Sequence, residues 1–211
     1  MGTGLVWYAS YGSNLKRERF LAYIKGGAPP GQSFEHRGAR DRTPPRDDRR
    51  IDIPHQLFFA RDSSGWGPGG VAFVEPVRRP DAHTIGRAYL VTVEQFEDVL
   101  SQENRWSEPR PFPLEEALAV GWVDLGEGWY DRSVSLGVLD GAPVLTFTES
   151  GRDGDQALRP PAASYIATIS QGLTELGLSA DEIVRYLRDK PGIDGRMSDG
   201  ELAAAVLPAS A

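Results

Sequence analysis

The chain passes from a strand-like run to a helix-like run through one short turn, Gly12-Ser13-Asn14, within the stretch YASYGSNL. Residues 4–11 are rich in Val, Trp and Tyr, which predicts a buried strand. Asn14 suits the N-cap of a helix over about 15–25, where apolar residues recur at roughly helical spacing. Such a turn either is a plain capped connection or presents backbone N–H groups to an anion. These residues alone leave both interpretations open.

The composition indicates a globular chain. Its 211 residues suffice for a domain with a core of its own, and 40% of them are hydrophobic. No apolar run has the length of a membrane span, and no basic-then-apolar leader precedes the first strand, so we expect a cytoplasmic protein without membrane contact. The net charge of −7 disfavours nucleic acid as a partner. The absence of Cys excludes disulfides, thiol nucleophiles and thiolate metal sites.

Strand-like runs dominate the middle of the chain and helix-like runs its last third, which predicts the α+β class. Strands are expected over about 51–61, 69–75, 84–92, 129–139 and 142–148, the last two joined at Asp140-Gly141. Helices are expected over about 93–104, 113–120 and 161–177, and after the capping boxes Ser179…Glu182 and Ser198…Glu201. No repeat or domain boundary is visible. A single domain over 1–207 with a disordered tail at 208–211 is therefore the expectation.

The segment 35–50, EHRGARDRTPPRDDRR, opposes the acidic balance with six Arg and four acidic residues. Together with the residues from 28 onward it is expected to be a loop, because it contains two adjacent prolines. One interpretation is a solvated loop whose charges pair locally; the other is a basic contact surface for a partner.

A carboxylate falls at the end of an apolar helix face. In the helix expected over about 93–104, Phe96 and Leu100 share a face with position 103. Glu103 also lies in the last turn, where the helix dipole disfavours negative charge. Burial and the dipole would both raise the pKa of Glu103, as proton transfer near neutral pH requires. The alternative is a helix that frays at Gln102 and lets Glu103 reach water.

The remaining candidates carry weaker signals. Tyr130 at a strand start and Tyr165 after a proline-rich lead-in lie outside regular core positions, although a core Tyr with a satisfied hydroxyl is the usual explanation. The run GWGPGG indicates a turn or a close backbone approach. No metal site is expected, because the three histidines lack ligand spacing: His36, His55 and His83.

These segments occur in an order that resembles the gamma-glutamylcyclotransferase-like family. YASYGSNL is similar to the strand–loop signature, and GGVAFVEP at 69–76 to a Gly-Gly-initiated region. IGRAYLVTVEQFEDVLSQEN at 85–104 resembles the segment that ends in Gln-Glu-Gly and carries the catalytic Glu. GWY at 128–130 and PPAASYIATISQGLTELGLS at 160–179 resemble the later strand and the helix with a substrate-contacting Tyr.

The resemblance implies a small mixed β-barrel flanked by helices, with a pocket beside the signature loop. It implies an intramolecular acyl transfer on a small γ-glutamyl substrate. The α-amine of the γ-glutamyl group attacks its own γ-carbonyl, which yields 5-oxoproline and a free amine or amino acid. Neither a metal nor a cofactor is needed for this reaction.

Carried over by position, Glu103 would be the general base and then the general acid. Backbone N–H groups of the signature would bind the substrate's carboxylate or the developing oxyanion. Tyr165 would hold the substrate, and Tyr130 would line the same pocket. The substrate-binding residues of the signature are then Tyr8, Ala9, Ser10, Tyr11, Gly12, Ser13 and Asn14.

The chain departs from the family pattern at several places. Asn104 follows the catalytic position where the family has Gly, and Asn also tolerates the left-handed conformation of helix ends. The segments 35–50 and 105–127 look like insertions, and 105–127 is expected to wall the pocket and change which leaving group fits. Two alternatives remain: a non-catalytic module that binds a small acidic γ-glutamyl-like ligand, and an interaction protein that uses the segment 35–50.

Overall fold

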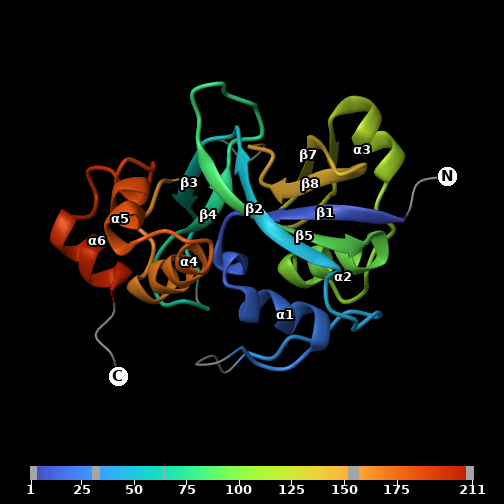
Figure 1. Cartoon of the computed structure of the whole chain (residues 1–211), viewed down its shortest axis with the longest axis horizontal. Coiled ribbons are helices and arrows are strands. Elements are labelled where there is room, and N and C mark those ends of the chain that lie inside the picture. The colour runs from blue at the N-terminus through green and yellow to red at the C-terminus, as the bar shows by residue number, and fades with distance from the viewer. Residues whose placement is uncertain (1–3, 30–33, 64, 152–156, 208–211) are drawn as a thin grey trace. The chain divides into compact units, whose positions relative to one another are not determined.

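The computed structural model describes residues 4–29, 34–63, 65–151 and 157–207 (Figure 1). The chain forms two compact units, each built from three separate stretches. Unit 1 comprises Met1–Ser10, Glu18–Ile51 and Gly86–Ser150, and unit 2 comprises Tyr11–Arg17, Asp52–Ile85 and Gly151–Ala211. The single-domain assignment stays a prediction, and the expected tail at 208–211 lies outside the described residues.

A six-stranded mixed sheet runs through unit 1 in the order β2-β5-β1-β8-β7-β6. Its strands are β1 (Leu5–Ser10), β2 (Asp47–Ile53), β5 (Thr84–Thr92), β6 (Trp122–Asp124), β7 (Arg132–Leu139) and β8 (Ala142–Thr148). Strand β1 is central, antiparallel to β5 and parallel to β8. The α+β class is confirmed, but the expectation of a barrel is wrong in one respect. Among the described strands, β2 and β6 are the two separate edges of an open sheet, and β3 and β4 form a second sheet with each other.

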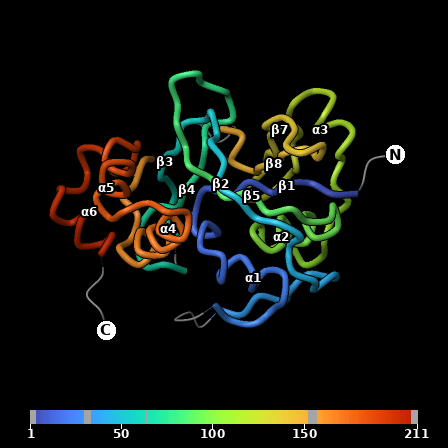
Figure 2. The backbone as a smooth tube through the Cα atoms, in the orientation of Figure 1, coloured from blue at the N-terminus to red at the C-terminus, as the bar shows by residue number. Residues whose placement is uncertain are grey.

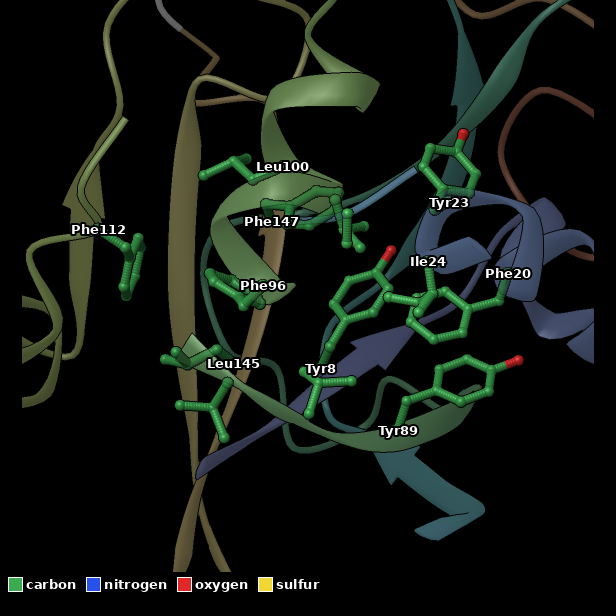
Figure 3. Close-up of a cluster of buried hydrophobic side chains, with 14 of the residues drawn as sticks. Tyr8, Phe20, Tyr23, Ile24, Tyr89, Phe96, Leu100, Phe112, Leu145 and Phe147 are labelled. Atoms are coloured by element: carbon green, nitrogen blue, oxygen red, sulfur yellow. The ribbon is translucent and has the colours of Figure 1, made fainter. Parts of the chain in front are cut away.

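An aromatic core fixes β1 within unit 1. The Tyr8 ring stacks on Phe147 of β8 at 4.9 Å between centroids and lies 5.6 Å from Phe20 and 6.0 Å from Phe96. Figure 3 shows Tyr8 between the Phe20 and Phe96 rings. Because four elements contribute to this one cluster, the strand and the helices around it are positioned together.

The helices of unit 1 are α1 (Arg17–Lys25), α2 (Val93–Glu103) and α3 (Leu114–Val120). The predicted capping box that starts α2 is confirmed, since Thr92 accepts from Gln95 N–H while Gln95 accepts from Thr92 N–H. The expected start of the first helix is wrong by two residues. A 3₁₀ turn, η1 (Ser13–Leu15), precedes α1, so Asn14 lies inside that turn instead of capping the helix.

Unit 2 combines the two-stranded sheet β3 (Leu57–Ala60) and β4 (Val71–Val74) with η1 and three helices. The helices are α4 (Ala163–Glu175), α5 (Ala180–Arg188) and α6 (Asp199–Val206). Both predicted capping boxes, at Ser179 and Ser198, are confirmed. The strand expected over 51–61 is interrupted after Ile53, because Pro54 lacks the N–H that a ladder requires. None of the described helices has the length and apolar character that crossing a bilayer requires.

Helix α4 packs directly on the turn that follows the signature glycine. A Cβ on Gly172 would lie 2.3 Å from the carbonyl carbon of Leu15 and 2.4 Å from the nitrogen of Lys16. Neither backbone atom can rotate away, so only a glycine allows this approach of helix and turn. Gly172 therefore sets the position of η1 within unit 2.

We expect Gly172→Ala to reduce the free energy of unfolding by more than ~2 kcal/mol, because the methyl group overpacks a backbone contact. Gly200→Ala is the matched control, since Gly200 also lies in a helix but a Cβ there meets nothing within 4 Å. That control should change the free energy of unfolding by less than ~1 kcal/mol. Urea denaturation measures both, and equal losses in the two variants would contradict the contact.

Candidate active site

The ten residues that the sequence singles out divide between the two units. Unit 1 holds Tyr8, Ala9, Ser10, Glu103 and Tyr130, and unit 2 holds Tyr11, Gly12, Ser13, Asn14 and Tyr165. Each set is described within its own unit. The convergence of both sets on one site stays a prediction.

Glu103 is the last residue of α2 and is half-buried. It lies one turn beyond Leu100 on the face that also carries Phe96, and both of these side chains belong to the core of unit 1. The Asn104 N–H donates to the Leu100 carbonyl at 3.1 Å, so the helix does not fray at Gln102, although the half-buried Glu103 still keeps part of its surface in contact with water. The left-handed residue at this helix end is Arg105, with φ 55°, whereas Asn104 keeps right-handed helical angles.

Tyr130 is connected to the end of α2 by hydrogen bonds and to β8 by a ring contact. Asn104 Nδ2 donates to the Tyr130 carbonyl at 3.0 Å, and the Tyr130 N–H donates to Asn104 Oδ1 at 2.9 Å. The Tyr130 ring meets Phe147 edge-on at 5.4 Å, and Phe147 stacks on Tyr8. Unit 1 thus brings Tyr130 and Tyr8 to one aromatic cluster and ties Tyr130 to the residue after Glu103.

The described residues 34–46, between α1 and β2, run beside α2 (Figure 2) and contact it through their side chains. Arg40 Nε donates to Asp98 Oδ1 at 3.0 Å, and the Arg40 main-chain N–H donates to Asp98 Oδ2 at 2.9 Å. Asp98 is 1% exposed, so its charge is compensated by this pair inside the protein. Arg37 donates to Ser101 Oγ at 2.6 Å. These pairs are long-range and not local, and the loop is shorter than expected because β2 already begins at Asp47.

In unit 2, the signature glycine lies against Tyr165. A Cβ on Gly12 would be 2.9 Å from the Tyr165 hydroxyl oxygen and 3.3 Å from Cβ of Ala72. Gly12 has φ −109°, so it is not the left-handed conformation that requires a glycine here. The requirement is space for the phenol. The three segments that carry the resemblance at positions 12, 72 and 165 therefore meet in one place.

The Tyr165 side chain is 2% exposed, and its hydroxyl accepts the Ala72 N–H at 3.2 Å. This arrangement matches the usual role of a core Tyr, and contact with a substrate stays a prediction. Trp66, from the run GWGPGG, meets the Tyr165 ring edge-on at 5.0 Å. Ser164 Oγ donates to the Trp66 carbonyl at 2.8 Å and holds that turn. The predicted close backbone approach is confirmed, since a Cβ on Gly69 would lie 2.5 Å from the Ala162 nitrogen.

The main-chain groups of the signature are partly used by the fold. Strand β1 is paired on both sides, so the backbone of Tyr8 takes part in the sheet, as does that of Ala9 and Ser10 toward β5. In the turn, the Leu15 N–H donates to the Gly12 carbonyl at 2.9 Å. Donation of signature N–H groups to a ligand stays a prediction.

Sequence reasoning missed two residues of interest in unit 1. Asn104 was interpreted as a tolerated replacement of the family's Gly, and nothing in the sequence around it predicted its hydrogen bonds to Tyr130. Glu149 directly follows β8 and is only 6% exposed, an unusual burial for a carboxylate. Within the described part of the chain, no three His, Cys, Asp or Glu side chains are grouped to hold a metal ion.

No family model matches the chain. Among curated proteins, "Histone deacetylase 5" of Arabidopsis thaliana is 40% identical over 198 residues, and the match covers 86% of this chain and 30% of that protein. The chain thus spans less than a third of the length of this relative.

The similar solved structures include a gamma-glutamyl cyclotransferase. It is 17% identical, with a TM-score of 0.49 over 96% of this chain and 98% of its own. An uncharacterized human protein is 18% identical, with a TM-score of 0.49 over 96% and 98% of the two chains. A yeast gamma-glutamyl cyclotransferase described as specific to glutathione is 14% identical, with a TM-score of 0.40 over 92% and 97%.

We expect Gly12→Ala to reduce the free energy of unfolding by ~1–3 kcal/mol, because the methyl group crowds the Tyr165 hydroxyl. Tyr165→Phe removes that oxygen but leaves the buried Ala72 N–H without its acceptor, at a cost of ~1–3 kcal/mol. The double variant should therefore lose ~1 kcal/mol less than the sum of the single losses. A double-mutant cycle in urea measures this coupling, and strict additivity would rule out the contact.

His36 provides a test by pH. Burial, with the nearby charge of Arg19 as the smaller cause, lowers the pKa of His36 from 6.5 to about 4. Between those values the unfolded chain binds a proton that the folded chain does not, so the free energy of unfolding should fall as pH decreases from 6.5 to 4. We expect His36→Gln to flatten this slope in urea titrations at several pH values. An unchanged slope would assign the acid sensitivity to other groups.

Proposed function

We propose that the protein is a gamma-glutamyl cyclotransferase-type enzyme, which converts a γ-glutamyl group to 5-oxoproline and releases an amine or amino acid. The observation that carries the proposal is the half-buried carboxyl of Glu103, which continues the core-facing side of α2. The ordered set of motifs supports it, because the signature glycine, the Gly-Gly region and the later Tyr are neighbours within unit 2.

In the proposed reaction, the Glu103 carboxylate takes a proton from the substrate's α-ammonium. The freed amine forms a bond to the γ-carbonyl carbon, and the carbonyl oxygen gains negative charge that backbone N–H groups of the signature, Tyr8 to Ser13, stabilise. The bond from that carbon to the departing nitrogen then breaks as Glu103 returns its proton to this nitrogen, and the new ring nitrogen releases its second proton to solvent, which leaves the neutral lactam. One carboxyl serves both steps because the transfers are sequential.

The protein's main contribution is then the conformation of the substrate. A five-membered ring closes readily once the amine and the carbonyl carbon are held near each other, so the site must fold the substrate and exclude competing water.

The alternative is a non-catalytic module. The similar stretch in the Arabidopsis protein is 30% of a longer chain, so a unit of this kind occurs within a larger protein. A binding module would retain affinity for γ-glutamyl compounds in calorimetry but release no 5-oxoproline from any of them.

We expect Glu103→Gln to lower 5-oxoproline release at least ~100-fold while the thermal midpoint stays close to that of the wild type, because the amide keeps the shape but cannot take a proton. Glu94→Gln is the control, since Glu94 is an exposed carboxylate at the opposite end of the same helix. It should leave the rate unchanged. A set of γ-glutamyl amines and amino acids supplies the substrates, and normal turnover by the Glu103→Gln variant would refute the role of Glu103.

A further inference from the structure

The residue after Glu103 holds a distant part of the chain by its side chain. Both polar atoms of the Asn104 amide are bonded to the main chain of Tyr130, as donor at 3.0 Å and as acceptor at 2.9 Å. The paired geometry fixes the orientation of Tyr130 more strictly than a single bond would. No Gly at position 104 could make either bond.

The partner segment is shaped to receive this amide. Gly128 has φ +149°, and a Cβ there would lie 2.1 Å from Asn104 Oδ1. Any other residue at 128 would occupy the place of the amide oxygen. Asn104 and Gly128 are thus matched across the whole segment 105–127.

The same segment is fastened at its start. Trp106 Nε1 donates to the Glu127 carbonyl at 2.7 Å, which joins the two ends of the segment. Arg37 donates to the carbonyls of Trp106 at 3.0 Å and Ser107 at 2.8 Å. The segment 105–127 is therefore fixed at both of its ends near the C-terminus of α2. Asn104 determines the position of Tyr130, which follows this segment.

We propose that Asn104 is a positioning residue that fixes Tyr130 as a wall of the substrate site beside Glu103, and that this wall selects the departing amine. The proposal rests on the proposed function. Tyr130 is held by its main chain to Asn104 and by its ring to Phe147, so loss of the Asn104 amide removes one of these restraints. Glu103 itself stays in place, because the last turn of α2 is closed by the main-chain bond from Asn104 to Leu100.

This division predicts a separation of kinetic constants. A looser wall weakens ground-state and transition-state contacts to the amine alike, which raises KM and leaves kcat nearly unchanged. We expect Asn104→Ala and Asn104→Gly to raise KM about tenfold, with kcat changed less than about threefold. The differences in KM between γ-glutamyl substrates with departing amines of different size should also become smaller in these variants.

Gly128 provides the second arm of the test. In the wild type, Gly128→Ala places a methyl group on the Asn104 oxygen and should raise KM as the Asn104 variants do. In an Asn104→Gly background that oxygen is gone, so the same substitution should add less than its effect on the wild type. If the two substitutions multiply KM independently, the proposed pairing of Asn104 with Gly128 is overturned.

Gln95→Ala is the stability control. Gln95 is buried at the other end of α2, where its amide donates to the carbonyls of Asp41 and Thr43. It should lower the thermal midpoint without a change in KM. If Asn104→Ala lowers the midpoint with KM unchanged, its role is structural and the inference is wrong.

Failure of the proposed function is distinguishable from failure of this inference. Absence of 5-oxoproline from the wild type with every γ-glutamyl substrate would remove the function, and the inference with it. The wild type could turn over substrate and Glu103→Gln could lose this activity, while Asn104→Ala keeps the wild-type KM. That combination would overturn the inference and leave the proposed function standing. Hydrogen exchange at the Tyr130 amide reports the hydrogen bonds between Asn104 and Tyr130 without any substrate. This exchange should be faster in Asn104→Ala, and unchanged protection of the amide would overturn the inference.

Discussion

The ring of Tyr8 is the contact on which unit 1 depends most. It packs against Phe147 from β8, Phe20 from α1 and Phe96 from α2, so one side chain joins the central strand to three other elements. Each such aromatic side chain removes roughly 150–250 Å² from water. The strand that leads into the signature turn and the helix that ends at Glu103 are therefore positioned by the same core, and neither can shift without opening it.

Charges then set the details of α2. Asp98 is buried under the segment that Arg40 belongs to, and removal of the Arg40 side chain would leave a buried carboxylate without its ion-pair partner. The Arg40 guanidinium itself is 47% exposed, so the pair is worth less than its short distances suggest. The main effect of the Arg40–Asp98 pair is to fix the position of α2 against the segment that contains Arg40. The Arg-rich segment acts as a brace for the helix, which accounts for two of its arginines without any partner protein.

Signals that rest on neighbouring residues could be predicted from the sequence. The three capping boxes and the Asp140-Gly141 turn were confirmed because a cap or a tight turn needs only the three or four residues that form it. The placement of Glu103 on the core-facing side of α2 followed from helical spacing in the same way. The features that the sequence did not reveal depend on which distant residues come together. Examples are the strand pairing that leaves the sheet open and the bond between Arg40 and Asp98.

Glycines illustrate why such contacts escape a reading of the sequence. A glycine is commonly explained by a left-handed backbone, yet Gly12 has φ −109° and is required by the hydroxyl of Tyr165, far along the chain. Gly172 is required by the backbone at Leu15, whereas Gly128 is required both by its own φ of +149° and by the amide of Asn104. For Gly12 and Gly172 the reason for the glycine is therefore found only in the distant residue that it contacts. The departure at Asn104 therefore makes sense only together with Gly128, because each residue leaves room for the other.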